Sequence, residues 1–276
     1  MISSMSGFVL LAALLHATWN AMLHGNRDRF LSMTWMSIGI ASIATVVALS
    51  VPVPARAAWP YIAVSGLVHG LYNLCLVYAY RRSDLGEAYP IARGSSPMLV
   101  ALGASAFANE QIHVLQAAGI ALVSCGIISF ALQRRRPSRE SIVAALLTGA
   151  TIACYTVIDG IGVRRAGGQA ISYTAWMFAF YWLMPAIFIA VRGRSALRSS
   201  FGDIGTSVSG GVVSIAAYGI VIWAMQFGAM GTVSALRETS VVFAVLIGRL
   251  FLREEVTFAR FVSCVVIAAG AVCIGL

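Results

Sequence analysis

Three charged residues stand inside long apolar stretches, and their types suit the binding of an anion. Arg93 lies between Gly86 and Ile112, while Arg237 and Glu238 are adjacent between Gly231 and Phe251. A charge facing lipid costs about 2.5–3.5 kcal/mol on insertion scales, so each of the three needs a physical reason to be there. Guanidinium groups present a planar fork of donors that fits a carboxylate or a phosphate. We therefore predict that Arg93, Arg237 and Glu238 belong to a substrate site.

Two further roles for these charges stay open. Arg93 and Arg237 each lie about 9–11 Å along a helix that starts at Gly86 or Gly231, and a long arginine can reach an interface from such a depth. Alternatively, Glu238 neutralises Arg93 or Arg237 and only holds two helices together. Neighbouring residues on a helix point about 100° apart. We therefore expect that Arg237 and Glu238 cannot easily pair with each other while both face one cavity, which leaves Glu238 freer to meet Arg93.

Further polar side chains follow helical spacing in two other apolar stretches. The two stripes are His16, Trp19 and Asn20, and His69, Tyr72 and Asn73. Their i, i+3 and i+4 spacing places each set on one face of a helix, which predicts a wetted cavity. Four aromatic residues are candidates for its walls, although packing and interface roles are open for them too: Tyr89, Tyr155, Tyr218 and Trp223.

Several of these groups can bind protons, which makes the proton a candidate partner. His16 or His69 can titrate near neutral pH, and a neutral histidine bonded to a neighbouring helix is the alternative. Burial can turn Glu238 into a proton carrier. Asp159 lies towards the end of its apolar stretch, where it either joins the cavity or reaches the interface.

The composition indicates that these residues lie in the membrane-spanning segments of a membrane protein. The chain has 276 residues, of which 59% are hydrophobic and 11% are charged, far from the balance of soluble domains. The net charge of +9 does not indicate nucleic acid, because the arginines lie in short clusters between apolar stretches. The N-terminus lacks the basic region of a cleavable signal peptide, so we expect the first stretch to be retained.

No metal or cofactor is expected. Five cysteines lie inside apolar stretches without a CxxC pair or a His/Cys spacing that suits zinc: Cys75, Cys125, Cys154, Cys264 and Cys273. The oligomeric state is left open.

The apolar stretches predict an all-α membrane protein with ten transmembrane helices. Each stretch has about the 20 residues that a helix needs to cross a bilayer core of roughly 30 Å. The predicted spans are 5–24, 31–51, 58–80, 86–107, 112–132, 141–163, 171–191, 204–227, 231–251 and 256–276. Gly86, Pro90, Gly94 and Pro97 predict a broken or kinked helix near Arg93, where unwound backbone would help form the site.

The spans divide five and five into a repeat of residues 1–133 and a second of residues 141–276. Gly86–Ile112 aligns with Gly231–Thr257 at an offset of 145 residues (231 − 86), which pairs Glu110 with Glu255. In this register Arg93 falls opposite Glu238. An odd number of spans per repeat inserts the halves upside down relative to one another, as in many secondary transporters with a central cavity.

The arginines predict the orientation. Fourteen lie in or beside the loops between spans 1 and 2, 3 and 4, 5 and 6, 7 and 8, and 9 and 10, against three on the side of the termini: Arg56, Arg164 and Arg165. Positive charge is enriched on the cytoplasmic side, so both termini are predicted to face away from the cytoplasm.

The whole chain resembles the EamA-type branch of the drug/metabolite transporter superfamily. The resemblance rests on LHATWNAM in the first span, GEAYPIARGSSP at Gly86–Pro97 with Glu110 beyond it, and the matching GTVSALRETSVVFAVLIGRLFLREE at Gly231–Glu255. It implies a basket of helices whose cavity is lined by spans 1, 3, 4, 6, 8 and 9. It also implies transport of small metabolites such as amino acids. LHATWN and the arginines further resemble a subgroup associated with phosphonate utilisation.

These observations predict a secondary transporter of the cell inner (plasma) membrane. It would move a small amino-acid-like or anionic metabolite by alternating access, and a carrier of organophosphonates is the alternative. A membrane enzyme using His16, His69 and Asp159 is not favoured, because the sequence has no nucleophile elbow, HExxH or P-loop. A sensor is a further alternative, although no soluble signalling domain is present.

Overall fold

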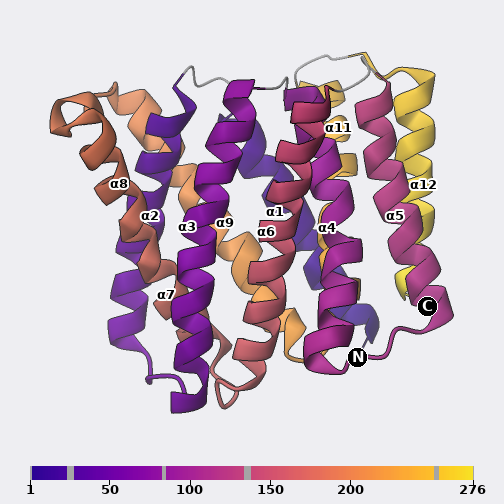
Figure 1. The fold of residues 1–276 in the computed structure, drawn as a ribbon, viewed down its shortest axis with the longest axis horizontal. Coiled ribbons are helices and arrows are strands. Elements are labelled where there is room, and N and C mark those ends of the chain that lie inside the picture. The colour runs from indigo at the N-terminus through magenta and orange to yellow at the C-terminus, as the bar shows by residue number, and fades with distance from the viewer. Residues whose placement is uncertain (1, 24–27, 83–84, 134–137, 252–254, 276) are drawn as a thin grey trace.

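A computed structural model describes residues 2–23, 28–82, 85–133, 138–251 and 255–275 as an array of helices packed side by side (Figure 1). The α-helices are α1 Ile2–Leu23, α2 Arg29–Ser50, α3 Trp59–Arg82, α4 Leu85–Ala108, α5 Val114–Leu132, α6 Arg139–Arg164, α7 Ala170–Ala179, α8 Leu183–Arg192, α9 Phe201–Met225, α10 Met230–Glu238, α11 Ser240–Phe251 and α12 Phe258–Gly275. Short 3₁₀ turns are η1 Arg56–Ala58, η2 Phe180–Trp182 and η3 Arg194–Leu197.

Polar residues between the apolar stretches start several helices. The Asp28 carboxylate accepts a hydrogen bond from the amide of Leu31 and caps α2. Ser138 and Ser200 cap α6 and α9 in the same way. Such caps satisfy amides that the first turn of a helix leaves without a partner. These polar residues between the apolar stretches therefore set helix boundaries within a few residues of those predicted.

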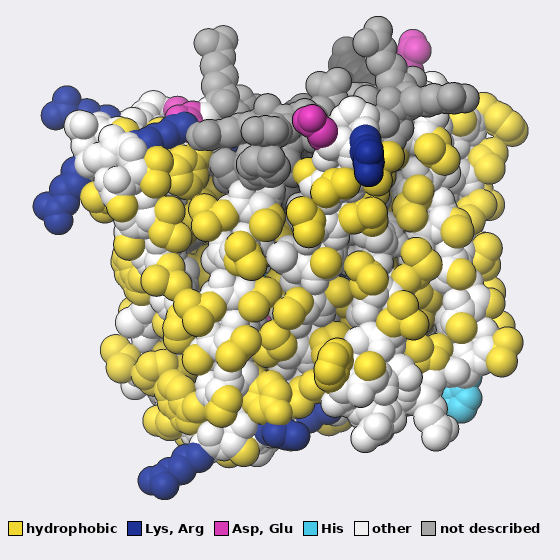
Figure 2. Space-filling view, in the orientation of Figure 1, with side chains coloured by type: hydrophobic (Ala, Val, Ile, Leu, Met, Phe, Trp, Pro, Cys, Tyr) yellow, Lys and Arg dark blue, Asp and Glu magenta, His cyan; other side chains and the backbone are white. Residues whose placement is uncertain are grey.

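Eight segments of the described residues are long and apolar enough to cross a membrane. Two of these segments are composite, because α7, η2 and α8 form Ala170–Arg192, and α10 and α11 form Met230–Phe251. α3 and α4 are not among the eight, although each has 24 residues. Hydrophobic side chains cover the lateral face of the molecule, and charged ones gather at its two ends (Figure 2). The molecule is a multi-pass membrane protein.

The helices pack closely where their facing residues are small. α5 lies against α12, and a Cβ added at Gly119 would come within 2.8 Å of the Gly270 carbonyl oxygen. Small residues let helix backbones approach in membranes, where van der Waals contact drives association. Other close pairs are α4 with α6, α3 with α6, and α1 with α9.

The fourth span is not broken, because α4 is one continuous helix with Pro90 and Pro97 inside it. Pro97 has no amide to donate to the Arg93 carbonyl oxygen, four residues earlier. The Ser96 hydroxyl donates to that oxygen instead, at 3.2 Å. Hydroxyl groups can satisfy carbonyls that a proline frees in a membrane helix.

The ninth predicted span contains the break. α10 ends at Glu238 and α11 begins at Ser240, with Thr239 between them. The Thr239 hydroxyl donates to the Leu236 carbonyl oxygen at 2.6 Å, which satisfies one carbonyl of the last turn.

Both termini lie at the same end of the helix array, the lower end in Figure 1. α2 and α12 begin at the opposite end, close to Arg29 and Arg260. We call these the termini end and the arginine-rich end.

Candidate functional site

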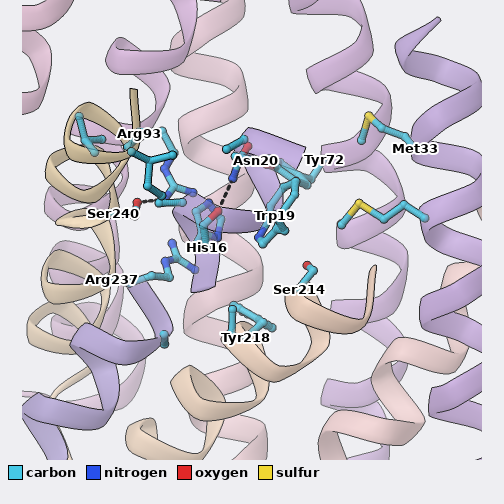
Figure 3. A pocket seen from close by; sticks show the side chains of 18 of the residues that line it. His16, Trp19, Asn20, Met33, Tyr72, Arg93, Ser214, Tyr218, Arg237 and Ser240 are labelled. Atoms are coloured by element: carbon cyan, nitrogen blue, oxygen red, sulfur yellow. Dashed lines mark hydrogen bonds between the residues drawn. The ribbon is translucent and has the colours of Figure 1, made fainter. Parts of the chain in front are cut away.

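A cavity of about 410 Å³ lies inside the helix array. Its lining extends from Arg93 and Arg237 to Arg29, Val256 and Arg260 at the arginine-rich end. Figure 3 shows the Arg93 and Arg237 side chains extending from one wall towards His16. The volume lies within the range of small-molecule sites.

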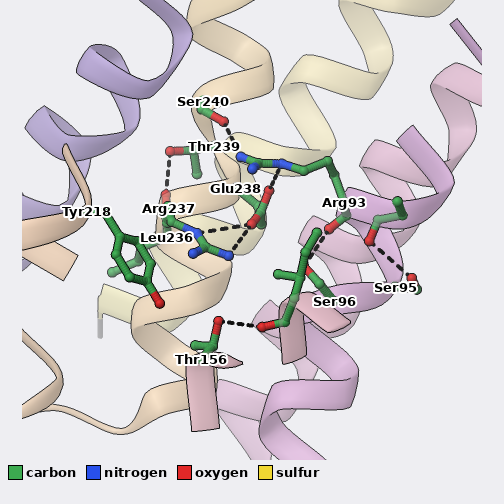
Figure 4. A network of polar contacts seen from close by, with 12 residues as sticks. Arg93, Ser95, Ser96, Thr156, Tyr218, Leu236, Arg237, Glu238, Thr239 and Ser240 are labelled. Carbon is green, nitrogen blue, oxygen red and sulfur yellow. Dashed lines mark hydrogen bonds and ion pairs between the residues drawn. The ribbon is translucent and has the colours of Figure 1, made fainter. Parts of the chain in front are cut away.

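Arg93, Arg237 and Glu238 form one buried cluster, which we call the charge triad (Figure 4). The Arg93 Nε lies 2.5 Å from Glu238 Oε2, and the Arg237 Nη2 donates to Oε1 at 2.9 Å. Arg93 and Arg237 are each 3% exposed, and Glu238 is fully buried. The Arg93 Nη2 also donates to the Ser240 hydroxyl at 3.0 Å. One carboxylate therefore holds two guanidinium groups from two different helices.

Arg237 and Glu238 pair with each other, but they do not both face the cavity, because only Arg237 lines it. Both the Nε and Nη2 of Arg237 donate to Glu238 Oε1, at 3.2 and 2.9 Å. The long arginine side chain bridges the 100° between adjacent positions at the point where α10 ends. This C-terminal turn also favours a cation, because the carbonyl ends of the peptide dipoles point there.

The triad does not neutralise itself. Two arginines and one glutamate sum to a charge of +1, and both arginines line the cavity while Glu238 lies behind them. Buried charges are stable only when paired and hydrogen-bonded. The triad therefore presents one positive charge to whatever enters the cavity.

Two polar atoms on α1 have no hydrogen-bond partner among the described residues. They are Nε2 of His16 and Nε1 of Trp19, both fully buried in residues that line the cavity. The two rings contact edge to face, with centroids 5.0 Å apart. The Asn20 amide donates to the His16 carbonyl oxygen at 2.8 Å. Unpartnered buried polar atoms are rare in folded proteins, which distinguishes these two among the residues that line the cavity.

Aromatic rings close the inner part of the cavity. His69 stacks on Tyr155 with centroids 3.9 Å apart, and its Nδ1 lies 3.0 Å from the Ser65 carbonyl oxygen. Tyr218 contacts both rings, and the Arg237 guanidinium carbon lies 5.8 Å from the Tyr218 centroid. This wall is apolar on its ring faces and polar at its hydroxyl groups.

At the termini end, another ion pair joins segments far apart in sequence. Arg164 Nη2 lies 2.5 Å from Glu110 Oε1, and Glu110 Oε2 accepts from the Met230 amide at 2.9 Å. Arg164 also donates to the carbonyl oxygens of Met225 and Gly228, at 2.9 and 2.8 Å. We call this arrangement the Glu110–Arg164 clasp.

A profile of the EamA-like transporter family matches residues 4–132 and again residues 139–276. The chain belongs to the EamA-like transporter family. It is thus a membrane transporter of the drug/metabolite transporter superfamily. This family is one of transporters, consistent with the prediction that the chain is not an enzyme. The phosphonate subgroup stays a prediction.

A solved crystal structure superposes on this EamA-family chain with a TM-score of 0.79. The match covers 99% of this chain and 98% of the other, at 20% sequence identity. At that identity it shows a shared fold. No curated protein matches the chain.

Most of the residues that the sequence singled out come together in this cavity. Its lining includes His16, Trp19, Asn20, His69, Tyr72, Asn73, Arg93, Tyr155, Tyr218 and Arg237. Trp223 does not line this cavity; it is 37% exposed and packs against Phe8 and Phe227. The Tyr89 side chain lies outside the described residues.

Other lining residues were missed. The resemblance implied spans 1, 3, 4, 6, 8 and 9, yet α2 contributes Ser32, Met33 and Ser37, and the segment from α7 to η2 contributes Phe178 and Tyr181. Isolated serines in an apolar stretch give no distinctive signal. Ser214, one turn before Tyr218 on α9, could have been found from its i, i+4 spacing.

Proposed function

We propose that this EamA-family protein is a secondary transporter that moves a small metabolite with one anionic group, of amino-acid-like size, by alternating access. The observation that carries the proposal is the charge of +1 that Arg93, Arg237 and Glu238 present to the cavity. A single carboxylate would neutralise this charge. A dianion would leave one negative charge without a partner, which favours carboxylates over phosphonate dianions.

The rest of the cavity supports the same ligand class. His16 Nε2 and Trp19 Nε1 can bind further polar atoms, and the rings of Tyr72, Tyr155 and Tyr218 offer faces to an apolar or ammonium group. Arg29 and Arg260 at the arginine-rich end add positive potential along the entry route, which favours anions.

The architecture proposed for this movement is ten membrane spans in two inverted halves, residues 1–133 and 141–276. α3 and α4 complete the ten, since 24 residues extend about 36 Å as a helix. The double match to one family profile supports the two halves. The cavity lining reaches the arginine-rich end, and the Glu110–Arg164 clasp joins both halves at the termini end. Opening the clasp while closing the other end would expose the cavity to the opposite side.

We assign the arginine-rich end to the cytoplasm, from the excess of arginines there, and the protein to the inner (plasma) membrane. The conformation described here then faces inwards, with both termini outside. A reporter fused to the C-terminus that is active only outside the cytoplasm is expected to be active. A cytoplasmic signal would reverse the assignment.

The substrate class is tested with ligands of matched size on purified protein. L-Lactate and L-alanine share a carboxylate and differ by one ammonium charge, and 2-aminoethylphosphonate represents the organophosphonate alternative. A ligand that binds the native state raises the unfolding temperature. We expect a carboxylate to do so, and a larger shift with the phosphonate would favour the alternative.

Transport is tested with the stabilising ligand in proteoliposomes. Arg93→Gln and Arg237→Gln are each expected to lose at least tenfold in affinity, because a charge-assisted contact contributes about 1.5–3 kcal/mol. Arg194→Gln is the matched control, since Arg194 is exposed on η3. Unchanged flux in both cavity variants would refute the role of the triad.

A further inference from the structure

Asp159 is a fully buried carboxyl group near the end of α6 that lies at the termini end of the molecule. It lies five residues before the end of α6, about 8 Å from that end. It neither reaches the interface nor lines the cavity, the two positions that the sequence left open. A buried carboxyl group inside a membrane protein is expensive and by default functional.

Its partners in the described part of the chain are hydroxyl groups. The Tyr173 hydroxyl donates to Oδ1 at 2.9 Å, and the Tyr218 hydroxyl donates to Oδ2 at 2.7 Å. No arginine is within ion-pairing distance of Asp159 over these residues, in contrast to Glu238. A carboxyl group held by hydroxyls can be satisfied both with and without its proton, because a hydroxyl can donate or accept.

Tyr218 connects this carboxyl group to the charge triad. Its hydroxyl binds Asp159, while its ring lies against the Arg237 guanidinium and lines the cavity. A change in charge at the triad therefore changes the electrostatic potential at Asp159, because only the Tyr218 side chain lies between them.

The charges of the two sites balance when the cavity is empty. Arg93 and Arg237 contribute two positive charges, and Glu238 and ionised Asp159 two negative ones, with both histidines neutral. A bound monoanion adds one negative charge to this buried region. Taking up one proton restores neutrality, and a carboxyl group without a cation is the group best placed to accept it.

We propose that Asp159 is a proton-binding site that takes up one proton when a monoanion enters the cavity. The step is Asp–COO⁻ plus H⁺ giving Asp–COOH, with no bond to substrate and no redox change. Released to the other side with the substrate, the proton makes the protein a proton–anion symporter. This inference deepens the proposed function and rests on it, but protonation at Asp159 can be measured without a substrate.

Other polar and titratable groups around Asp159 could contribute to a pH response and have to be separated from it. They are Tyr155 on α6, Ser65 and His69 on α3, Tyr173 on α7, Tyr181 on η2, Tyr218 on α9 and Arg237 on α10. Only a carboxyl group gives an infrared C=O stretch that appears on protonation.

The first experiment records infrared difference spectra of purified protein during a pH titration. We expect a buried C=O band that is missing in Asp159→Asn and kept in Glu255→Gln, whose carboxylate is exposed. Arg237→Gln removes a positive charge, as an arriving anion would, and should move the midpoint of the band up on the order of one pH unit. Glu238→Gln should move it down. A band unaffected by Asp159→Asn, or no shift in either charge variant, would overturn the proposal.

The second experiment measures L-lactate in proteoliposomes. Wild-type protein should accumulate lactate when the substrate side is more acidic. Asp159→Asn should lose this accumulation and keep lactate–lactate exchange, which moves no net proton. Accumulation by Asp159→Asn equal to that of the wild type would refute the proton site. If the wild type neither binds nor exchanges any probe, the proposed function fails, and the infrared result alone decides the proton site.

Discussion

Replacing Glu238 with glutamine tests the charge triad most directly. The change keeps the shape of the side chain and removes the only negative charge between Arg93 and Arg237, so the local charge rises from +1 to +2. Both guanidinium groups are 3% exposed and cannot regain hydration without moving. Two unit charges about 4 Å apart attract by roughly 4 kcal/mol at an effective dielectric constant of 20.

The net loss of stability should be about 3–5 kcal/mol, the usual result of removing one partner of a buried pair. Membrane proteins often unfold irreversibly, so the assay is the rate of unfolding in detergent at several temperatures, compared with wild-type protein. Glu255→Gln is the control, because Glu255 is exposed and its neutralisation should change stability by less than about 0.5 kcal/mol.

A second change separates charge from shape. Arg93→Gln combined with Glu238→Gln leaves only Arg237 charged and restores +1. This double variant should be more stable than Glu238→Gln alone, which a sum of two independent losses cannot produce. If Glu238→Gln unfolds as slowly as wild-type protein, the cluster is hydrated and the reasoning from buried charge is refuted.

Three further changes test the contacts around the cavity. Glu110→Gln should open the clasp and speed hydrogen–deuterium exchange in residues 226–230, and unchanged exchange would mean that the ion pair does not hold the termini end closed. Tyr218→Phe keeps the ring and removes a hydrogen bond to Asp159, so unfolding should be faster by a barrier change of about 1.5–3 kcal/mol; equal rates would show that another donor replaces it. Gly119→Val should lower the yield of folded protein, because a Cβ there meets α12, whereas Gly205→Ala, with no atom within 4 Å, should express normally.

Helix positions were predictable because a membrane span has a fixed length and apolar composition. The polar stripes of α1 and α3 were predictable from the fixed period of an α-helix. His16 and Asn20, like His69 and Asn73, are four residues apart and so lie on one face of their helix. The same helix periodicity explains why Trp223 is absent from the cavity lining. It lies five residues after Tyr218, about 140° around α9, and so faces away from the cavity.

The break between α10 and α11 could not be predicted from local sequence. Proline and glycine mark breaks, and they are abundant in α4, which stays helical, and absent at Thr239. Ion pairing between Arg237 and Glu238 was missed because it depends on where the helix ends. Tertiary contacts decide both features. The role of Asp159 was open because burial at a helix end depends on neighbours far away in the chain.

The unequal helices at the centre have a consequence for the transport cycle. Were the two proposed halves interchangeable, swapping their shapes would produce an opposite-facing form of equal free energy. An intact α4 facing an interrupted α10–α11 segment removes that degeneracy. In the proposed alternating-access cycle, one facing direction would then be the resting form of the empty carrier, and the free energy of ligand binding would have to shift the population towards the other.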